Sequence, residues 1–340
     1  MAYLENNLLL TIAIPTYNRS NFLDQALLSI YNQIGDKADL IEIIVSDNNS
    51  SDNTTEVVNQ HIRNGLPINY VKNDVNKGAD FNISQCFKLA NGKFVLTFGD
   101  DDKLLNGTID KIIAVIKEYP DFGILYLNWR LISDGILAID EKSPVLMFND
   151  YEDFLKKISH NITFISGNVV NKKFVKDIYF EKYFATSLIQ LPFFLTAVLN
   201  SPYNLYFQEP SVAVPVNNSG GYSICTVFGS NINQIFQEYS TDEKRKRTFK
   251  AIKDELLTVC FPGWIKRLKS SGHKFTDVEI HKVLKPIYKD NLNYWIYNYP
   301  LIIQPGRMLN ITWPVYTLYS LFITKVLKKR VRFKYTIAKI

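Results

Sequence analysis

Three consecutive aspartates, Asp100, Asp101 and Asp102, follow the apolar run FVLTFG at residues 94–99. Carboxylates this close repel one another and resist ionisation unless a cation joins them. Oxygen-rich sites suit Mg²⁺ or Mn²⁺, which often join one or two carboxylates to the phosphates of a substrate. The triplet therefore predicts a site for a metal and a diphosphate, and the alternative interpretation is a solvated turn between a strand and a helix.

Short apolar runs alternate with helical patterns through the first hundred residues. The runs lie at 8–14, 41–45, 68–71 and 94–98. Uninterrupted apolar strands that alternate with helices predict a mostly parallel sheet with both faces covered. Ligands of such sheets bind at the carboxyl ends of the strands. The aspartates lie at such an end, as do the polar segments 15–19, 47–49 and 76–78, so we expect all of them to converge on one crevice.

The rest of the chain is less regular. Beyond residue 105 we expect a strand at 122–129, a helix at 151–158 and, over 162–170, a strand followed by a loop. The apolar segment 185–199 predicts a helix that Pro192 kinks or interrupts. Separate strands are expected at 203–209 and 211–216, a hairpin around Asp134–Gly135, and helices from about 231 onward.

Composition sets the class of the protein. The chain has 340 residues, of which 46% are hydrophobic, and this is enough for one large domain and a smaller appendage. Its three cysteines, Cys86, Cys225 and Cys260, form no CxxC pair and predict neither a disulfide framework nor a zinc site. We also expect no signal peptide and no transmembrane span.

Charge is distributed unevenly along the chain. Residues 1–240 hold 18 Lys/Arg and 26 Asp/Glu, whereas residues 241–340 hold 21 Lys/Arg and 7 Asp/Glu. A basic C-terminal region on an acidic body predicts an anionic partner for that region. Aromatic and apolar residues followed by basic ones over 311–335, including Trp313, Tyr316, Tyr319 and Phe322, favour an interfacial segment on an anionic membrane. Nucleic acid is less favoured, since no recognition motif for it is present.

The motifs at the predicted strand ends resemble a known family. TIAIPTYNRSNFLDQALLSI, IEIIVSDNNSSDNT and NKGADFNISQCFKLANGKFVLTFGDDD are similar to the nucleotide-sugar domain of family 2 glycosyltransferases with the GT-A fold. The resemblance is strong over residues 8–105 and can be traced to about residue 220. It implies an α/β GT-A catalytic domain over 1–225, with a nucleotide-sugar half (1–105) and an acceptor half (106–225). A helical region over 226–340 follows.

The resemblance also implies a donor site built from strand ends. The base and ribose would lie against Pro15, Thr16, Tyr17, Asp47 and Asn49, and the nucleotide would lie along Asn76 and Gly78. The aspartate run would be the DxD element. Asp100 and Asp102 satisfy D-x-D as written, whereas the commoner form D-x-D-D leaves Asp101 and Asp102 as the equivalents. We favour Asp101 and Asp102 at the metal and Asp100 toward the ribose. The cofactor would be Mg²⁺ or Mn²⁺, and the donor a nucleotide sugar, with UDP as the default from its frequency in the family.

The acceptor side departs from the family pattern. Ser166, Gly167 and Asn168 match the segment that approaches the acceptor. Gln190 stands where inverting members usually carry an acidic pair, and glutamine cannot accept a proton from a hydroxyl. Either another acid serves, with Glu181 and Glu209 the nearest in sequence, or the enzyme is retaining. Asp102 and Gln190 are the catalytic candidates, and no base is assigned.

The resemblance leads to a functional hypothesis with two rivals. We expect metal-dependent transfer of a sugar to a glycan or lipid-linked acceptor in O-antigen or capsule synthesis, in the cytoplasm and peripherally on the inner face of a bacterial membrane. A nucleotidyltransferase is less favoured because no Gly-rich phosphate loop is present. A non-catalytic nucleotide-sugar-binding protein of the same fold remains an alternative because of Gln190.

Overall fold

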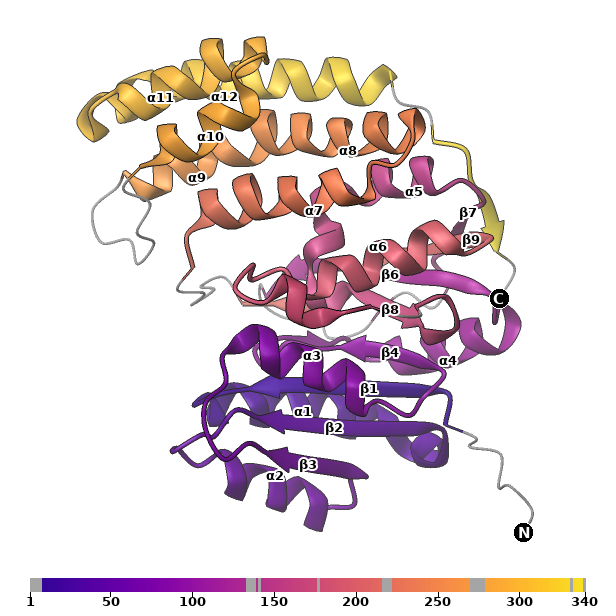
Figure 1. Ribbon diagram of the computed structural model, residues 1–340. Helices are drawn as coiled ribbons and strands as arrows, with labels where there is room; N and C mark the ends of the chain where they lie inside the picture. The colour runs from indigo at the N-terminus through magenta and orange to yellow at the C-terminus, as the bar shows by residue number, and fades with distance from the viewer. Residues whose placement is uncertain are drawn as a thin grey trace.

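The computed structural model describes residues 8–132, 139, 142–175, 178–215, 222–269, 279–330 and 333–338. Within these residues the strands form one ten-stranded sheet (Figure 1) in the order β10-β7-β9-β6-β8-β4-β1-β2-β3, and the short β5 pairs with β9. The strands are β1 Leu10–Thr16, β2 Ile41–Asp47, β3 Ile68–Lys72, β4 Phe94–Thr97, β5 Lys103–Leu104, β6 Phe122–Leu131, β7 Val145–Phe148, β8 Asn168–Asn171, β9 Tyr203–Val214 and β10 Thr336–Ala338.

The four strands of the N-terminal half are parallel, as predicted. β1 pairs with both β2 and β4, and β2 pairs with β3. Leu10, Ile12 and Ile14 of β1 enter one hydrophobic core, whereas Ala13 enters another on the opposite face. Because both faces are covered, these strands are apolar throughout rather than alternately apolar and polar.

Helices cover the two faces of this half. One core contains side chains of α1 (Ser20–Ile34), α2 (Thr54–Arg63) and α4 (Thr108–Glu118). The other contains side chains of α3 (Ala79–Leu89) and α6 (Gln190–Asn200). The C-terminal ends of β1, β2, β3 and β4 therefore meet at one edge of a sheet whose faces are closed, and this edge is the open place for a ligand.

The second half of the sheet is mixed. β8 is antiparallel to both β4 and β6, while β6 and β9 are parallel. β7 pairs antiparallel with β9, and β10, near the end of the chain, pairs antiparallel with β7. The short helical segments here are α5 Tyr151–Ile158, η2 Ser159–Thr163, η3 Ile165–Gly167, η4 Lys172–Phe174 and η5 Phe180–Tyr183, and η1 Gly35–Leu40 lies in the first half.

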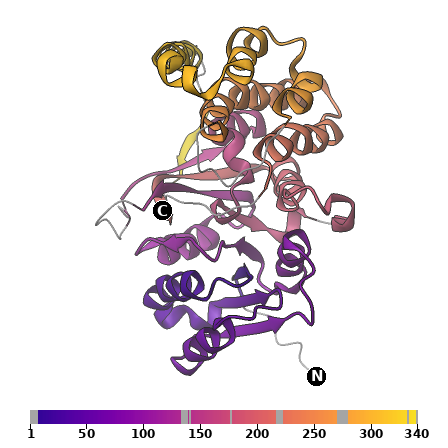
Figure 2. The same ribbon diagram turned by 90° about the vertical axis from the view of Figure 1, so that its left-hand side faces the viewer.

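Helices form the rest of the described chain. They are α7 Ile232–Tyr239, α8 Glu243–Glu255, α9 Phe261–Leu268, α10 Ile280–Tyr288, α11 Tyr299–Ile303 and α12 Gly306–Arg330, with π-helical turns η6 Thr226–Asn231, η7 Leu256–Cys260 and η8 Tyr294–Asn298. Figure 2 shows this layer at the end of the molecule opposite β1–β3. Its buried aromatic residues, such as Phe249 and Phe261, belong to the same core as α6. The predicted boundary near residue 225 stays a prediction.

Two expectations at the acceptor side are wrong in detail. Over 162–170 the irregular part comes first and the strand begins at Asn168, because the Asn168 amide donates to the carbonyls of Ile162 and Phe164 and holds a compact turn. The helix expected over 185–199 begins only at Gln190, so Pro192 lies in its first turn and not in its interior. A proline costs little there, since first-turn N–H groups lack helical partners anyway.

A third expectation is wrong for the following segment. Residues 203–214 form the single strand β9 rather than two strands. Pro210 lies within it, at a register irregularity opposite Asn128 of β6. A bulge tolerates proline because it does not need that residue's N–H for the ladder. The expected hairpin around Asp134–Gly135 lies outside the described residues.

Candidate donor and acceptor site

The polar ends of the parallel strands converge at one edge, as the sequence predicts. Thr16, the last residue of β1, donates from its hydroxyl to Asp100 Oδ2 over 2.8 Å. Asn48, next to the end of β2, donates its backbone N–H to the Thr16 carbonyl over 3.0 Å. The Asn48 side-chain amide donates to Asn76 Oδ1, beyond β3, over 2.7 Å. Residues from four strand ends thus form one hydrogen-bonded group.

The three aspartates are held in different directions. Arg19 bridges the first two, with 2.6 Å from Nη1 to Asp100 Oδ1 and 3.1 Å from Nη2 to Asp101 Oδ2. Ser166, from the other half of the sheet, donates its hydroxyl to Asp102 Oδ2 over 2.5 Å. The same hydroxyl accepts the Gly99 N–H over 2.8 Å. The cluster is therefore partly neutralised by one guanidinium and oriented by hydrogen bonds to both halves.

Burial makes two of these carboxylates unusually weak acids. Burial, opposed by Arg19 and by the Thr16 hydrogen bond, raises the pKa of Asp100 to about 6. Burial, helped by repulsion from Asp101 and Asp100, raises the pKa of Asp102 to about 7, and the Ser166 hydrogen bond opposes this rise. A cation placed beside these groups would favour their charged forms and reverse the shifts. The site is therefore electrostatically prepared for added positive charge.

The space above Gly99 fits a cation held by few protein ligands. In the described part of the chain, no three His, Cys, Asp or Glu residues converge as a metal site made only of protein would require. However, a Cβ built on Gly99 would lie 2.9 Å from Asp102 Oδ2, 3.2 Å from Ser166 Oγ and 3.3 Å from Asp101 Oδ1. Two carboxylates and a hydroxyl thus face a cradle that any side chain would fill. Such a set suits Mg²⁺ or Mn²⁺, which take further ligands from substrate phosphates.

Asp47 is a fully buried carboxylate at the end of β2. It accepts the Ser50 N–H over 2.8 Å and the Tyr70 hydroxyl over 2.6 Å, and Lys72 Nζ lies 3.8 Å away. These contacts explain how the charge is tolerated in the fold. Contact of Asp47 with a nucleobase stays a prediction.

Sequence reasoning missed the residue that organises this edge, Asn48. Besides Asn76, its side chain binds the Gly78 carbonyl and the Lys77 N–H, over 3.2 Å and 2.9 Å, so it shapes the turn before α3. Asn49, the predicted neighbour of the base, is exposed and has a φ of +67°, a conformation that asparagine tolerates. The sequence feature that could have pointed to Asn48 was its position directly after strand β2.

The remaining predicted donor residues surround this edge. Pro15 lies in β1 beside Thr16, and Tyr17 follows with an exposed ring. Asn76 is exposed and accepts the Gly78 N–H over 2.9 Å. Gly78 has a φ of +86°, which glycine adopts without strain. Contact of these four residues with a nucleotide stays a prediction.

The predicted acceptor residues are all buried. Ser166 supports Asp102, Gly167 packs against the rings of Tyr126 and Phe164, and Asn168 holds the preceding turn. The exposed surface beside them is aromatic, because Trp129 of β6 lies 6.0 Å from Phe164, centroid to centroid. The Trp129 indole donates to Asn161 Oδ1 over 3.2 Å.

Gln190 begins α6 and is buried. Its Nε2 donates to the Thr163 carbonyl over 2.9 Å, and its Oε1 is buried without a hydrogen-bond partner among the described residues. Glu181 instead forms an exposed ion pair with Lys88 over 2.9 Å, and Glu209 lies on β9. A catalytic role for either acid stays a prediction.

The carboxylate that reaches the start of α6 is Asp80, which sequence reasoning also missed. It lies in the first turn of α3 and accepts the Ser187 N–H over 3.1 Å. Burial raises its pKa, although backbone N–H groups of residues 185–189 oppose the shift. Ala185 and Ser187 have φ values of +67° and +55°, so the loop before α6 is held in a conformation that costs energy. An acid directly after the Gly78 turn was the available signal.

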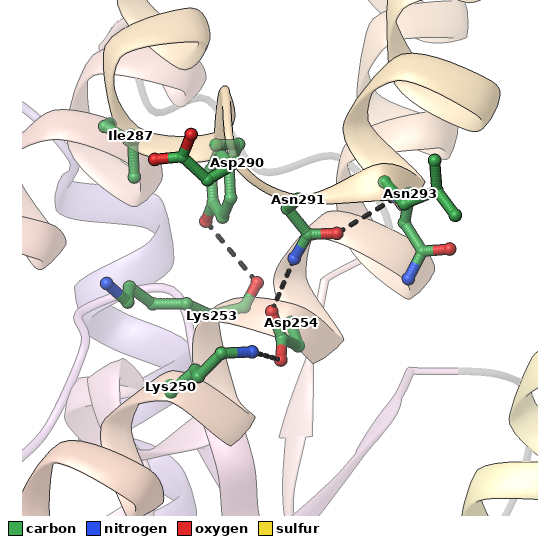
Figure 3. A pocket seen from close by; sticks show the side chains of 9 residues that line it. Lys250, Lys253, Asp254, Ile287, Asp290, Asn291 and Asn293 are labelled. Atoms are coloured by element: carbon green, nitrogen blue, oxygen red, sulfur yellow. Dashed lines mark hydrogen bonds and ion pairs between the residues drawn. The ribbon is translucent and has the colours of Figure 1, made fainter.

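A cavity lies elsewhere, in the helical layer. It has a volume of about 410 Å³ and lies between α8 and the segment after α10. Figure 3 shows Lys250 and Asn291 both bound to Asp254. The Lys250–Asp254 ion pair measures 2.6 Å, and the Asn291 amide donates to Asp254 over 2.7 Å. With no surplus charge and no link to the aspartate run, it does not compete as the donor site.

Comparisons with known proteins agree with this geometry. Residues 11–179 match the profile of glycosyl transferase family 2. The chain belongs to this family. It is 32% identical over 226 residues to the abequosyltransferase RfbV of Salmonella typhimurium, across 60% of this chain and 66% of that protein.

Two further likenesses extend the family assignment. The chain is 31% identical over 179 residues to the GalNAc(5)-diNAcBac-PP-undecaprenol beta-1,3-glucosyltransferase of Campylobacter jejuni, across 50% of this chain and 56% of that one. The alignments thus span just under two thirds of the length of the S. typhimurium protein and just over half of the length of the C. jejuni protein. The crystal structure of S. aureus TarS 1–349 with UDP-GlcNAc matches 90% of this chain and 92% of that one, with a TM-score of 0.60 at 16% identity. This match confirms the expected GT-A fold.

Proposed function

We propose that this family 2 protein transfers a sugar from a nucleotide diphosphate sugar to an acceptor in bacterial surface polysaccharide synthesis. The observation that carries the proposal is the cradle above Gly99, where Asp101, Asp102 and Ser166 direct oxygens at one point. This cradle lies at the carboxyl edge of a parallel sheet, and nucleotides bind at that edge in this kind of architecture. Both relatives are named as sugar transferases, which supports sugar transfer as the reaction class.

The metal is part of the proposal. Asp101 and Asp102 would hold Mg²⁺ or Mn²⁺, which would offset the charge of the diphosphate as it leaves. Asp100, which is bound by Thr16 and Arg19, would face the ribose. Asp102 is therefore the residue on which activity should depend most.

The nucleotide would lie along the ends of β1, β2 and β3. Pro15, Thr16, Tyr17, Asp47, Asn49, Asn76 and Gly78 are the proposed contacts. UDP is the default donor nucleotide. The S. aureus TarS structure that this fold matches was solved with UDP-GlcNAc. In this arrangement the exposed Tyr17 ring offers a stacking surface, while buried Asp47 offers its carboxylate to a base N–H.

The acceptor would approach over the segment of Ser166, Gly167 and Asn168. The Trp129–Phe164 pair beside it offers aromatic rings, tilted by 57° to one another, against which a sugar ring could pack. A glycan or a lipid-linked oligosaccharide at the inner face of the cytoplasmic membrane is the proposed acceptor. The C. jejuni relative is named for an undecaprenol-linked acceptor, which supports the second choice.

No side chain is assigned as a base. Gln190 cannot accept a proton, and it uses its amide N–H to hold the Thr163 carbonyl. We propose that it positions the acceptor segment and that proton removal is carried out elsewhere, or that the reaction is retaining. Asp80, which lies in the first turn of α3 and accepts the Ser187 N–H of the loop that leads into α6, is the acid to examine first.

A product assay tests the transferase proposal directly. Purified protein is incubated with UDP-, GDP- and CDP-sugars, Mn²⁺ and a polysaccharide-precursor extract, and sugar transfer and donor hydrolysis are followed by mass spectrometry. We expect turnover of one donor that requires Mn²⁺ and is lost in Asp102→Asn. Donor binding without any turnover would instead favour the non-catalytic binding protein.

A further inference from the structure

Helix α12 has an apolar face that the described protein leaves uncovered. Met308, Ile311, Val315, Leu318 and Phe322 follow one another at spacings of three and four residues and are between 50% and 79% exposed. Residues with this spacing lie along one side of a helix. Leu321, 52% exposed, widens the stripe. Single exposed apolar residues are ordinary, but a continuous stripe of this kind marks an interaction surface.

The other side of α12 is firmly attached to the protein. Leu309 is buried, and Trp313, Tyr316 and Tyr319 pack against the helical core. The Tyr319 hydroxyl donates to Asn293 Oδ1 over 3.0 Å, and the Tyr319 ring meets Tyr297 in an edge contact at 4.8 Å. Of the four aromatic residues expected at a membrane interface, Trp313, Tyr316 and Tyr319 therefore face inward, whereas Phe322 and the aliphatic residues of the stripe face outward.

The charge of this region is uniform. After Asp290 the chain contains eight Lys/Arg and no Asp or Glu through residue 340. Lys325, which continues the spacing of the stripe, is exposed. Lys328, Lys329 and Arg330 close the helix in the sequence. Apolar contact and positive charge are thus combined on one element.

We propose that the outward face of α12 docks on an anionic membrane surface. An amphipathic helix with an apolar stripe and basic residues is the form that lies in the plane of a bilayer interface. The stripe spacing also fits a coiled coil with a second copy of the chain. However, two copies would bring basic segments together without acidic partners, whereas anionic lipid supplies the opposite charge. No helix in the described part of the chain has the length and apolar character of a membrane span.

Docking would also orient the catalytic sheet. Beyond α12 the chain returns to pair β10 with β7, so Thr336 lies opposite Met147 and Ala338 opposite Val145. The helix is therefore tied to the sheet after its C-terminal end (Figure 1), and Trp313, Tyr316 and Tyr319 pack it against the helical core. When a helix held in this way binds the membrane, the sheet takes a fixed orientation relative to the membrane.

Vesicle flotation with the full chain tests the proposal without any sugar substrate. Binding is measured to vesicles of phosphatidylcholine alone and of phosphatidylcholine mixed with phosphatidylglycerol. We expect binding to the anionic vesicles only, and weakening at high salt. Ile311→Gln with Leu318→Gln should reduce binding roughly tenfold or more. Lys325→Gln, Lys328→Gln and Lys329→Gln together should reduce it about a hundredfold.

Matched changes elsewhere provide the control. Leu28→Gln with Ile62→Gln removes two exposed apolar side chains from α1 and α2, and should leave vesicle binding unchanged. Thermal unfolding of each variant checks that folding is retained. Equal binding to both kinds of vesicle, or full binding by the Ile311/Leu318 variant, would overturn the proposal. The proposal would also be overturned if the protein did not bind vesicles and instead formed a dimer that the Ile311/Leu318 variant dissociates. Nucleotide binding is measured separately, so failure here leaves the transferase proposal intact.

Discussion

The donor edge and the acceptor edge of the sheet differ in how their polar groups are satisfied. At the donor edge Asp47, Asp100, Asp101 and Asp102 each accept hydrogen bonds from side chains or backbone of neighbouring strand ends. On the acceptor side, Asn168 and Gln190 use their amide N–H groups to hold the turn, and both carbonyl oxygens are left buried without partners among the described residues.

The difference indicates which half is formed before substrate arrives. Buried polar atoms are almost always paired, and an unpaired one usually marks a water molecule or a ligand. Under the proposed function, the donor edge would need only a cation and a nucleotide. The acceptor side has two carbonyl oxygens that require hydrogen-bond donors, and water or a sugar hydroxyl can supply them. Four changes test this contrast.

Asp102→Asn should have the largest effect. It removes the charge that faces the Gly99 cradle while keeping the shape of the side chain, and transfer should fall by roughly 10²–10³-fold, as expected when a stabilising charge is lost. Steady-state transfer rates provide the measurement. Asp110→Asn, in an exposed acid that pairs with Lys37, is the control and should keep full activity. Equal rates for the two variants would remove Asp102 from the reaction.

Arg19→Ala should destabilise the donor edge. Asp100 is buried and would lose its cation, at a cost of about 2 kcal/mol in the free energy of unfolding, less than for a fully buried pair because Arg19 is partly exposed. Urea unfolding measures the change. The control is Arg63→Ala, which breaks an exposed pair with Glu56 and should cost under about 1 kcal/mol. Similar losses in both variants would show that Arg19 does not neutralise the cluster.

Acid should weaken metal binding. The pKa of Asp100 is raised to about 6 and that of Asp102 to about 7, above their values in the unfolded chain. The protonated acids therefore stabilise the free protein at low pH, and this contribution is lost as pH rises through these values. Cation binding requires the opposite, charged forms. Titrations followed by thermal shift should show tighter Mn²⁺ binding at about pH 8 than at about pH 5.5, and the reverse order would contradict this electrostatic account.

Gln190→Ala should have the smallest effect on the reaction. Thr163 would lose the donor to its carbonyl, which costs about 1–2 kcal/mol of stability. Transfer should change only severalfold, because a residue that cannot take a proton contributes no base catalysis. Gln190→Glu should not increase the rate, since its carboxylate would face the Thr163 carbonyl. A large gain in that variant would identify this position as the missing base and end the contrast drawn here.

Much of the donor edge could be predicted from the sequence. Each of the four apolar runs became a parallel strand, and the expected polar residues lie at the end of the strand or a few residues beyond it. The convergence of Thr16 with Asp100 follows from topology alone, because adjacent parallel strands bring their carboxyl ends together. The central role of Asn48 could not be read, since any asparagine after a strand looks like an ordinary turn former.

The acceptor side was less predictable because long-range contacts decide it. Asn168 folds the preceding turn through its own amide, which reverses the expected order of strand and loop. Asp80 reaches the start of α6 from a helix more than a hundred residues earlier in the chain. No local pattern encodes such a pairing. The outward and inward sides of α12 likewise depend on which side meets Tyr297.

The central claim is that one cation joins Asp101 and Asp102 to a diphosphate at the sheet edge. It is tested most directly by thermal unfolding with UDP, GDP and CDP, each with and without Mn²⁺, in the wild-type protein and in Asp102→Asn. We predict that one nucleotide raises the melting temperature only when Mn²⁺ is present, and only in the wild type. An equal rise without metal, or in Asp102→Asn, would contradict the claim.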